Sequence, residues 1–121
     1  MFLAASDTPC YHPPMRIAAL ETSGKIGSVA LADGERTLCE LSFERGLVHG
    51  RDLVPTLQRL LVEVGWRVRD VEVFAVSQGP GSYTGLRVGI ATARSLAWAT
   101  GARLLGICTL DALARNAPPG T

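Results

Sequence analysis

The sequence predicts one α/β domain built on a mixed five-stranded sheet. Three features of the chain carry that prediction. Short apolar strands come first, leucines at helical spacing follow, and strands then alternate with helices. The 121 residues are 47% hydrophobic and 19% charged, which suits a globular domain with a modest core.

The first three strands are expected over 17–21, 27–32 and 37–43. Asp33-Gly34 separates the second from the third and is a strong signal for a hairpin turn. Because tight turns join successive strands, these three are expected to pair antiparallel.

A change of period marks the first helix. Apolar residues recur at helical spacing at Leu53, Leu57, Leu60, Leu61 and Val64. Gly65 supplies the stop. Pro55 is tolerated if Asp52 caps this helix, because Pro55 then lies in the first turn, where an N–H has no partner within the helix.

A strand, a helix, a strand and a short helix follow, over 71–76, 83–100, 103–108 and 110–115. Ser82 is the expected N-cap of the longer helix, Gly101 its stop, and Thr109 the cap of the short one. Right-handed crossovers place the last two strands beside the first, in the order 3-2-1-4-5. Ribonuclease H-like domains and actin-like ATPase half-domains have this arrangement.

The most informative segment is 77–87, SQGPGSYTGLR, between the fourth strand and the second helix. A turn on Gly79-Pro80-Gly81 into a helix N-terminus lets the chain approach an anion or a partner closely, and it also serves as a plain strand-to-helix connection. The segment is not a Walker A loop, because no Lys follows Gly85. Its G-x-G-x-x-x-G spacing is one residue too long for the dinucleotide fingerprint.

Glu21-Thr22-Ser23 ends the first strand. A carboxylate followed by two hydroxyls could hold a metal–phosphate group, whereas in a plain turn the hydroxyls bond to local backbone. No motif places a second carboxylate, and His12 and His49 lack metal-ligand spacing, so neither a catalytic residue nor a metal site is predicted. The candidate nucleotide or phosphate contacts are Glu21, Thr22, Ser23, Gly79, Gly81 and Ser82.

Small residues recur every fourth position in the second helix, at Gly85, Gly89, Ala93 and Ala97. Each glycine inside a helix costs roughly 0.5–1 kcal/mol against alanine, so close packing must offset it. The stripe either packs on the first helix or meets a second subunit. The sequence interpretation favours the second subunit, and the predicted partner surface consists of Leu57, Leu61, Gly85, Gly89 and Ala93.

Two motifs resemble the TsaB (YeaZ) family of tRNA threonylcarbamoyladenosine biosynthesis. They are IAALETS at 17–23 and QGPGSYTGLRVG at 78–89. His49 with the following leucine, valine and proline resembles the family's His-x-x-x-Leu-Leu-Pro helix start. The resemblance covers about 15–116. Glu21 stands where TsaB proteins usually have Asp, and Glu-Thr-Ser is the version seen in the catalytic homologue.

The resemblance implies an actin-like fold, of which 15–116 looks like the first of two half-domains. Residues 1–14 are expected to be a flexible tail, with Met15 an alternative start, and 117–121 a tail or truncated linker. The family implies a non-catalytic, activating scaffold that pairs with a TsaD-like catalytic subunit through the helices of its first domain. That subunit carries the metal-binding histidines. A small TsaE-like ATPase joins, and the assembly modifies the adenosine beside the tRNA anticodon.

A net charge of +1 argues against a nucleic-acid binder that relies on its own basic field, so tRNA is expected only through the complex. Cys10, Cys39 and Cys108 lack C-x-x-C spacing and no signal peptide or membrane span is evident, which favours the cytoplasm. The chain alone is expected to hold no cofactor, with ATP or Mg bound weakly or within the complex, and a homodimer is a further option. The alternative is an independent nucleotide-binding ATPase or hydrolase using Glu21, Thr22 and Ser23.

Overall fold

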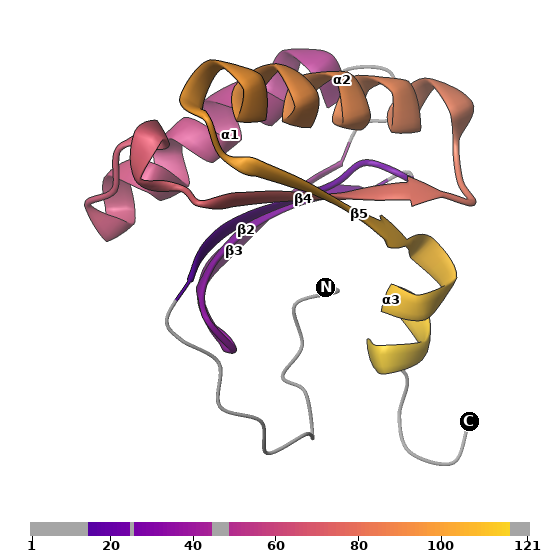
Figure 1. Ribbon diagram of the computed structural model, residues 1–121. Helices are drawn as coiled ribbons and strands as arrows, with labels where there is room; N and C mark the ends of the chain where they lie inside the picture. The colour runs from indigo at the N-terminus through magenta and orange to yellow at the C-terminus, as the bar shows by residue number, and fades with distance from the viewer. Residues whose placement is uncertain (1–14, 25, 45–48, 117–121) are drawn as a thin grey trace.

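The computed structural model describes residues 15–24, 26–44 and 49–116 (Figure 1). The segments predicted as tails, 1–14 and 117–121, lie outside the described residues. The elements are β1 (Arg16–Glu21), β2 (Ile26–Asp33), β3 (Arg36–Glu44), α1 (His49–Val64), the 3-10 turn η2 (Val68–Asp70), β4 (Val73–Gly79), α2 (Tyr83–Thr100), β5 (Arg103–Cys108) and α3 (Thr109–Asn116).

The five strands form one sheet in the order β3-β2-β1-β4-β5, which confirms the predicted topology. The hairpin strands β1, β2 and β3 pair antiparallel. The crossover strands β4 and β5 pair parallel to β1 and β4 respectively. At the centre, Leu20 of β1 lies opposite Val29 on one side and Val76 on the other. Because β1 and β4 are parallel, their carboxyl ends meet at one edge.

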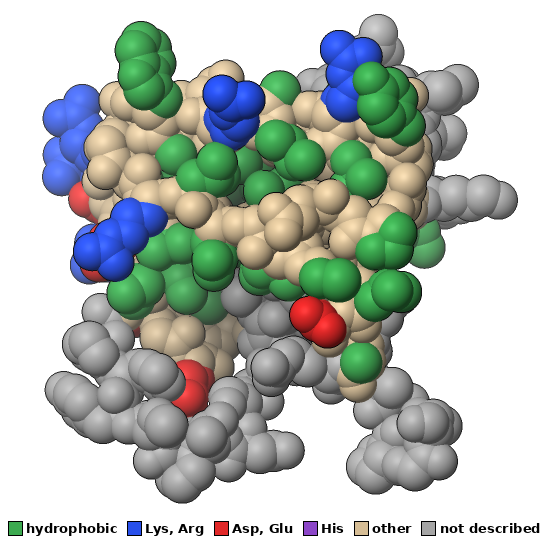
Figure 2. Space-filling model, turned by 45° about the vertical axis from the view of Figure 1, so that its right-hand side comes forward, with side chains coloured by type: hydrophobic (Ala, Val, Ile, Leu, Met, Phe, Trp, Pro, Cys, Tyr) green, Lys and Arg blue, Asp and Glu red, His purple; other side chains and the backbone are tan. Residues whose placement is uncertain are grey.

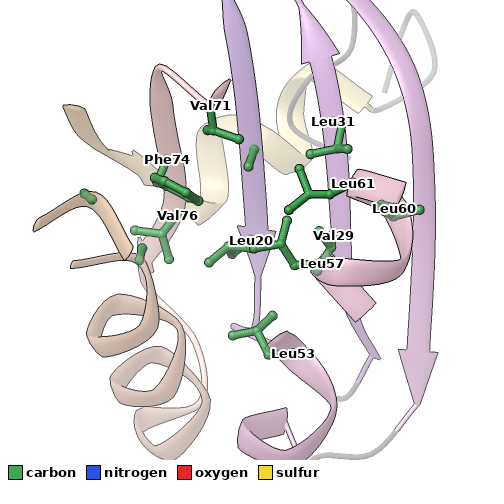
Figure 3. Close-up of a cluster of buried hydrophobic side chains, with 13 residues drawn as sticks. Leu20, Val29, Leu31, Leu53, Leu57, Leu60, Leu61, Val71, Phe74 and Val76 are labelled. Carbon is green, nitrogen blue, oxygen red and sulfur yellow. The ribbon is translucent and has the colours of Figure 1, made fainter. Parts of the chain in front are cut away.

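Two helices cover one face of the sheet and one covers the other (Figure 1). Under α1 and α2 lies the main core, where leucines of α1 meet branched and aromatic side chains of the central strands (Figure 3). The α3 face is built differently, since small side chains dominate it, and its buried cluster consists of Ala19, Ala30, Ala75 and Ala112. The larger apolar side chains are therefore concentrated under α1 and α2.

Two element boundaries differ from the sequence prediction. Helix α1 begins at His49, ahead of Asp52, so Pro55 lies in the body of the helix rather than in its first turn. The proline is exposed, which lets water satisfy the carbonyl that its missing N–H would have paired. Strand β4 begins at Val73 because η2 precedes it, and the Val71 N–H donates to the Val68 carbonyl at 3.2 Å.

The α2 boundaries agree with the prediction. The Ser82 side chain accepts a hydrogen bond from the Gly85 N–H at 3.3 Å, as expected of an N-cap. Gly101 ends the helix in the left-handed region with φ 76°. Thr109, predicted as a cap, is the first helical residue of α3.

At the opposite end of β1, Asp70 joins η2 to the sheet. It accepts the Arg67 N–H at 2.8 Å, and its other oxygen lies 4.0 Å from Arg16 Nη1. The Arg67 backbone hydrogen bond, with the Arg67 and Arg16 charges, holds the pKa of Asp70 below its ordinary 3.8. On β3, burial raises the pKa of the Cys39 thiol and the Glu63 charge raises it further.

Candidate functional site at the sheet edge and on helix α2

Glu21 and Ser77 end adjacent parallel strands on the same side of the sheet. One Glu21 oxygen accepts hydrogen bonds from the Ser23 N–H at 2.8 Å and from the Ser23 hydroxyl. The other oxygen accepts the Ser77 hydroxyl. Both oxygens of the carboxylate are therefore engaged by donors of this chain, and Glu21 ties the end of β1 to the end of β4.

Thr22 lies on the opposite side of β1 and is fully buried. Its hydroxyl donates to the Gly85 carbonyl of α2 at 2.6 Å. A Cβ added at Gly89 would collide with the Thr22 hydroxyl oxygen and touch Val76. These two glycines therefore let α2 approach β1 closely, and the Thr22 hydroxyl fixes that approach.

The β4–α2 loop closes over the end of β1. The Ser82 N–H donates to the Ser23 carbonyl at 2.8 Å. A Cβ added at Gly81 would lie 2.6 Å from both the Cβ and the carbonyl oxygen of Ser23. Gly79 has φ 124° and precedes Pro80 through a cis peptide bond. The structure thus brings the two predicted segments together at the carboxyl edge of the sheet, in direct contact with each other.

Chemically, this edge is rich in hydroxyls but poor in acids and ligands. Glu21 supplies a carboxylate whose oxygens are already paired, and the Thr22 hydroxyl is committed to α2. Among the described residues, no three His, Cys, Asp or Glu side chains gather as a metal site would require. Ser82 and Gly81 are exposed and remain accessible to a ligand at this edge.

Sequence reasoning missed two residues here. Ser77 was not identified, although the parallel register of Leu20 with Val76 places Ser77 directly beside Glu21. The strand prediction had stopped at 76, so the residue was not placed on the sheet. Gly106 of β5 was also missed: a Cβ there would collide with the side chain of Gln78. Nothing local in the sequence signals that contact, because it depends on the register of β4 with β5.

The predicted partner surface is corrected by the structure. The five residues assigned to it are all buried within this chain, and they are Leu57, Leu61, Gly85, Gly89 and Ala93. Leu57 and Leu61 pack in the core under α1. The small-residue stripe faces the sheet, so neither the first helix nor a second subunit accounts for it. Close helix approach was inferred correctly, but its counterpart is the chain's own β1 and β4.

The chain matches the family model described as TsaD, tRNA N6-adenosine threonylcarbamoyltransferase, over residues 47–120. It is 32% identical over 108 residues to the tRNA threonylcarbamoyladenosine biosynthesis protein TsaB of Escherichia coli, and 30% identical over 102 residues to that of Bacillus subtilis. These alignments cover 85% and 84% of this chain. The chain belongs to the TsaB (YeaZ) family.

Solved structures agree with this assignment. YeaZ from Pseudomonas aeruginosa superposes with a TM-score of 0.73 at 32% identity, covering 78% of this chain and 44% of that one. Thermus thermophilus RuvC superposes with a TM-score of 0.50 at 13% identity, a likeness of fold alone. The fold is thus ribonuclease H-like. The chain spans 44% of the length of the two TsaB proteins compared above.

On this TsaB-family chain, the outer side of α2 carries the side chains that the inner stripe does not. Tyr83 and Trp98 are 73% and 90% exposed, and Arg87 and Arg94 lie exposed between them. The Arg87 guanidinium stacks over the Tyr83 ring, 5.5 Å from its centroid. Helical spacing of four, seven and four residues places all four on one side, a signal available in the sequence that was not used. No described helix is both long and apolar enough to span a membrane.

Proposed function

We propose that this chain is a non-catalytic, activating scaffold in tRNA threonylcarbamoyladenosine modification. It pairs with a TsaD-like catalytic subunit, a TsaE-like ATPase joins the assembly, and tRNA is contacted only through the complex, in the cytoplasm. Membership of the TsaB family supports the pathway. The scaffold role and the partners rest on the arguments below.

The observation that carries the proposal is the state of the sheet edge. A general acid or base needs a titratable group that can reach a substrate proton. Here the Glu21 carboxylate is paired on both oxygens and Thr22 is buried under α2. Glu21 and Thr22 spend their hydrogen bonds on joining β1, β4 and α2. This supports a structural role for the Glu-Thr-Ser segment rather than turnover.

The same geometry bears on nucleotide binding. Gly81 is in contact with Ser23, and the Ser82 N–H is already donated to that residue's carbonyl. A phosphate at this loop would have to compete with those contacts. We therefore expect ATP, with or without Mg, to bind the chain alone no better than roughly millimolar, on the order of −4 kcal/mol.

The partner surface lies on the outer side of the helical layer. Val62 of α1 is 80% exposed, and Tyr83 and Trp98 of α2 are similarly open. Large apolar and aromatic side chains that stand in water without a structural role are typical of protein contact sites. This surface replaces the buried residues that the sequence interpretation assigned to the interface.

The test is a pair of calorimetric titrations. The chain is titrated with the TsaD-family subunit of the same organism without nucleotide, and separately with Mg-ATP. Nucleotide-independent binding of the subunit, with millimolar or weaker ATP affinity, supports the scaffold. Low-micromolar ATP affinity together with ATP hydrolysis by the chain alone would favour the independent ATPase instead.

A further inference from the structure

The outer face of α2 carries positive charge and aromatic rings without any acid. We define this face by Tyr83, Arg87, Arg94 and Trp98. The whole α2 sequence contains no Asp or Glu. Within the described part of the chain, no carboxylate forms an ion pair with Arg87 or Arg94. Figure 2 shows the result: blue and green side chains gather along the top, over α2, and red ones lie elsewhere in this view.

A groove of about 680 Å³ runs beside this face, between the second half of α2 and β5. Small residues, among them Ala91, Ser95 and Gly101, form much of its lining. Leu104 supplies an apolar wall, and Arg94 and Trp98 stand at its rim. A groove lined by small side chains lets another helix approach closely, and the arginine and the indole then flank the visitor.

The charges on this face discriminate between possible occupants. A second copy packed across α2 would bring Arg87 and Arg94 against their own counterparts, with no carboxylate on either helix to separate them. Like charges brought together in a desolvated contact oppose association. A nucleic acid would satisfy the arginines, but the groove is mainly apolar and the whole chain carries a net charge of only +1. A protein helix that carries carboxylates satisfies both the arginines and the groove.

We infer that the outer face of α2 selects a partner helix with acidic side chains flanking an apolar stripe, and that this charge match favours the heteromeric pair over self-association. The apolar stripe enters the groove against Leu104, and the carboxylates pair with Arg87 and Arg94. Trp98 packs across the visiting helix. This inference rests on the proposed pairing with a TsaD-like subunit and adds to it the chemistry of recognition.

The test uses charge reversal and salt. The whole chain and its Arg87→Glu and Arg94→Glu variants are titrated with the TsaD-family subunit of the same organism. Each reversal is expected to weaken binding by about tenfold or more, and Arg94→Gln by less. Raising the salt from roughly 0.05 to 0.5 M is expected to weaken wild-type binding and to narrow the gap between wild type and the variants. Arg69→Glu, an exposed arginine on η2, is the matched control and is expected to bind as wild type.

Circular dichroism and urea unfolding establish that each variant is folded, and Arg94→Gln keeps the test informative if a reversal unfolds the chain. Wild-type affinity in the α2 variants, with no salt dependence, would overturn this inference while leaving the scaffold proposal intact. Absence of any binding by wild type would overturn both. A wild-type homodimer that dissociates on Arg94→Glu, or binding of polyuridylate RNA tighter than the subunit and lost in the same variants, would contradict the acidic-helix partner.

Discussion

The two sides of α2 differ in every property that packing and recognition depend on. The inner side carries Gly85, Gly89, Ala93 and Ala97, all buried. The outer side carries two aromatic rings and two arginines in water. One helix therefore does two jobs. Its smallest residues allow contact with β1 and β4, and its largest residues are left free for something outside the chain.

The comparison shows how a small-residue stripe should be interpreted. Such a stripe indicates a close approach, but it does not say to what. Here Thr22 reaches from β1 to the Gly85 carbonyl and occupies the space that side chains at Gly85 and Gly89 would need. The bulky, charged side of the same helix is the better guide to a partner, because nothing within the described chain satisfies it.

The strongest way to break this comparison is Gly89→Leu. The added side chain would enter the space of Thr22 and Val76, so we expect overpacking to cost roughly 3 kcal/mol of unfolding free energy. Urea denaturation followed by circular dichroism measures the loss. Ala91→Leu, an exposed position on α2, is the control and should change the stability by less than about 0.5 kcal/mol. Equal stability of the two variants would mean that the inner side is not packed as described.

Trp98→Ala tests the other side. Because this side chain is 90% exposed, its loss should leave the unfolding free energy within about 0.5 kcal/mol of wild type. Binding to the TsaD-family subunit should weaken by about 2 kcal/mol, as for a tryptophan at the centre of an interface. Calorimetry and urea unfolding on the same preparation separate the two effects. A variant that loses stability but keeps its affinity would reverse the roles assigned to the two sides.

Much of this architecture is predictable from local patterns. Alternation and hairpin signals placed β1 to β3, and leucine spacing placed α1 on the sheet. Ser82 and Gly101 marked the ends of α2. The sheet order followed from crossover handedness. What failed was whatever depends on register between distant segments. Pairing of Glu21 with Ser77 requires β1 and β4 to be aligned, and burial of Gly89 requires α2 to be placed over Thr22.

Thr22→Val sharpens the account of the inner side. The valine fills the same space but leaves the Gly85 carbonyl without its buried donor, so we expect a loss of about 1–2 kcal/mol in unfolding free energy. Thr22→Ser retains the hydroxyl and should recover part of that loss. Chemical denaturation of the three proteins provides the comparison. If Thr22→Val is as stable as wild type, the hydrogen bond to Gly85 is not what holds α2 on β1.

The smallest expected effect concerns Asp70, far from both sides of α2. Its pKa in the folded state lies below the ordinary value of 3.8, so the ionised form stabilises the fold above that value. This contribution falls away as the pH drops through the folded-state pKa. Asp70→Asn should therefore lose less stability than wild type on acidification from neutral pH to about pH 2. Parallel acid titrations followed by circular dichroism would show this, and coincident curves would contradict it.

The most direct test of the central claim is hydroxyl-radical footprinting of the chain alone and mixed with the TsaD-family subunit. Trp98 is exposed in the free chain, whereas Trp66 is half-buried beside Arg16, with the guanidinium 5.4 Å from its ring centroid. If the partner covers the outer side of α2, oxidation of Trp98 and Tyr83 falls several-fold in the mixture while that of Trp66 stays constant. A complex that forms while Trp98 and Tyr83 oxidise at their free rates would contradict the claim.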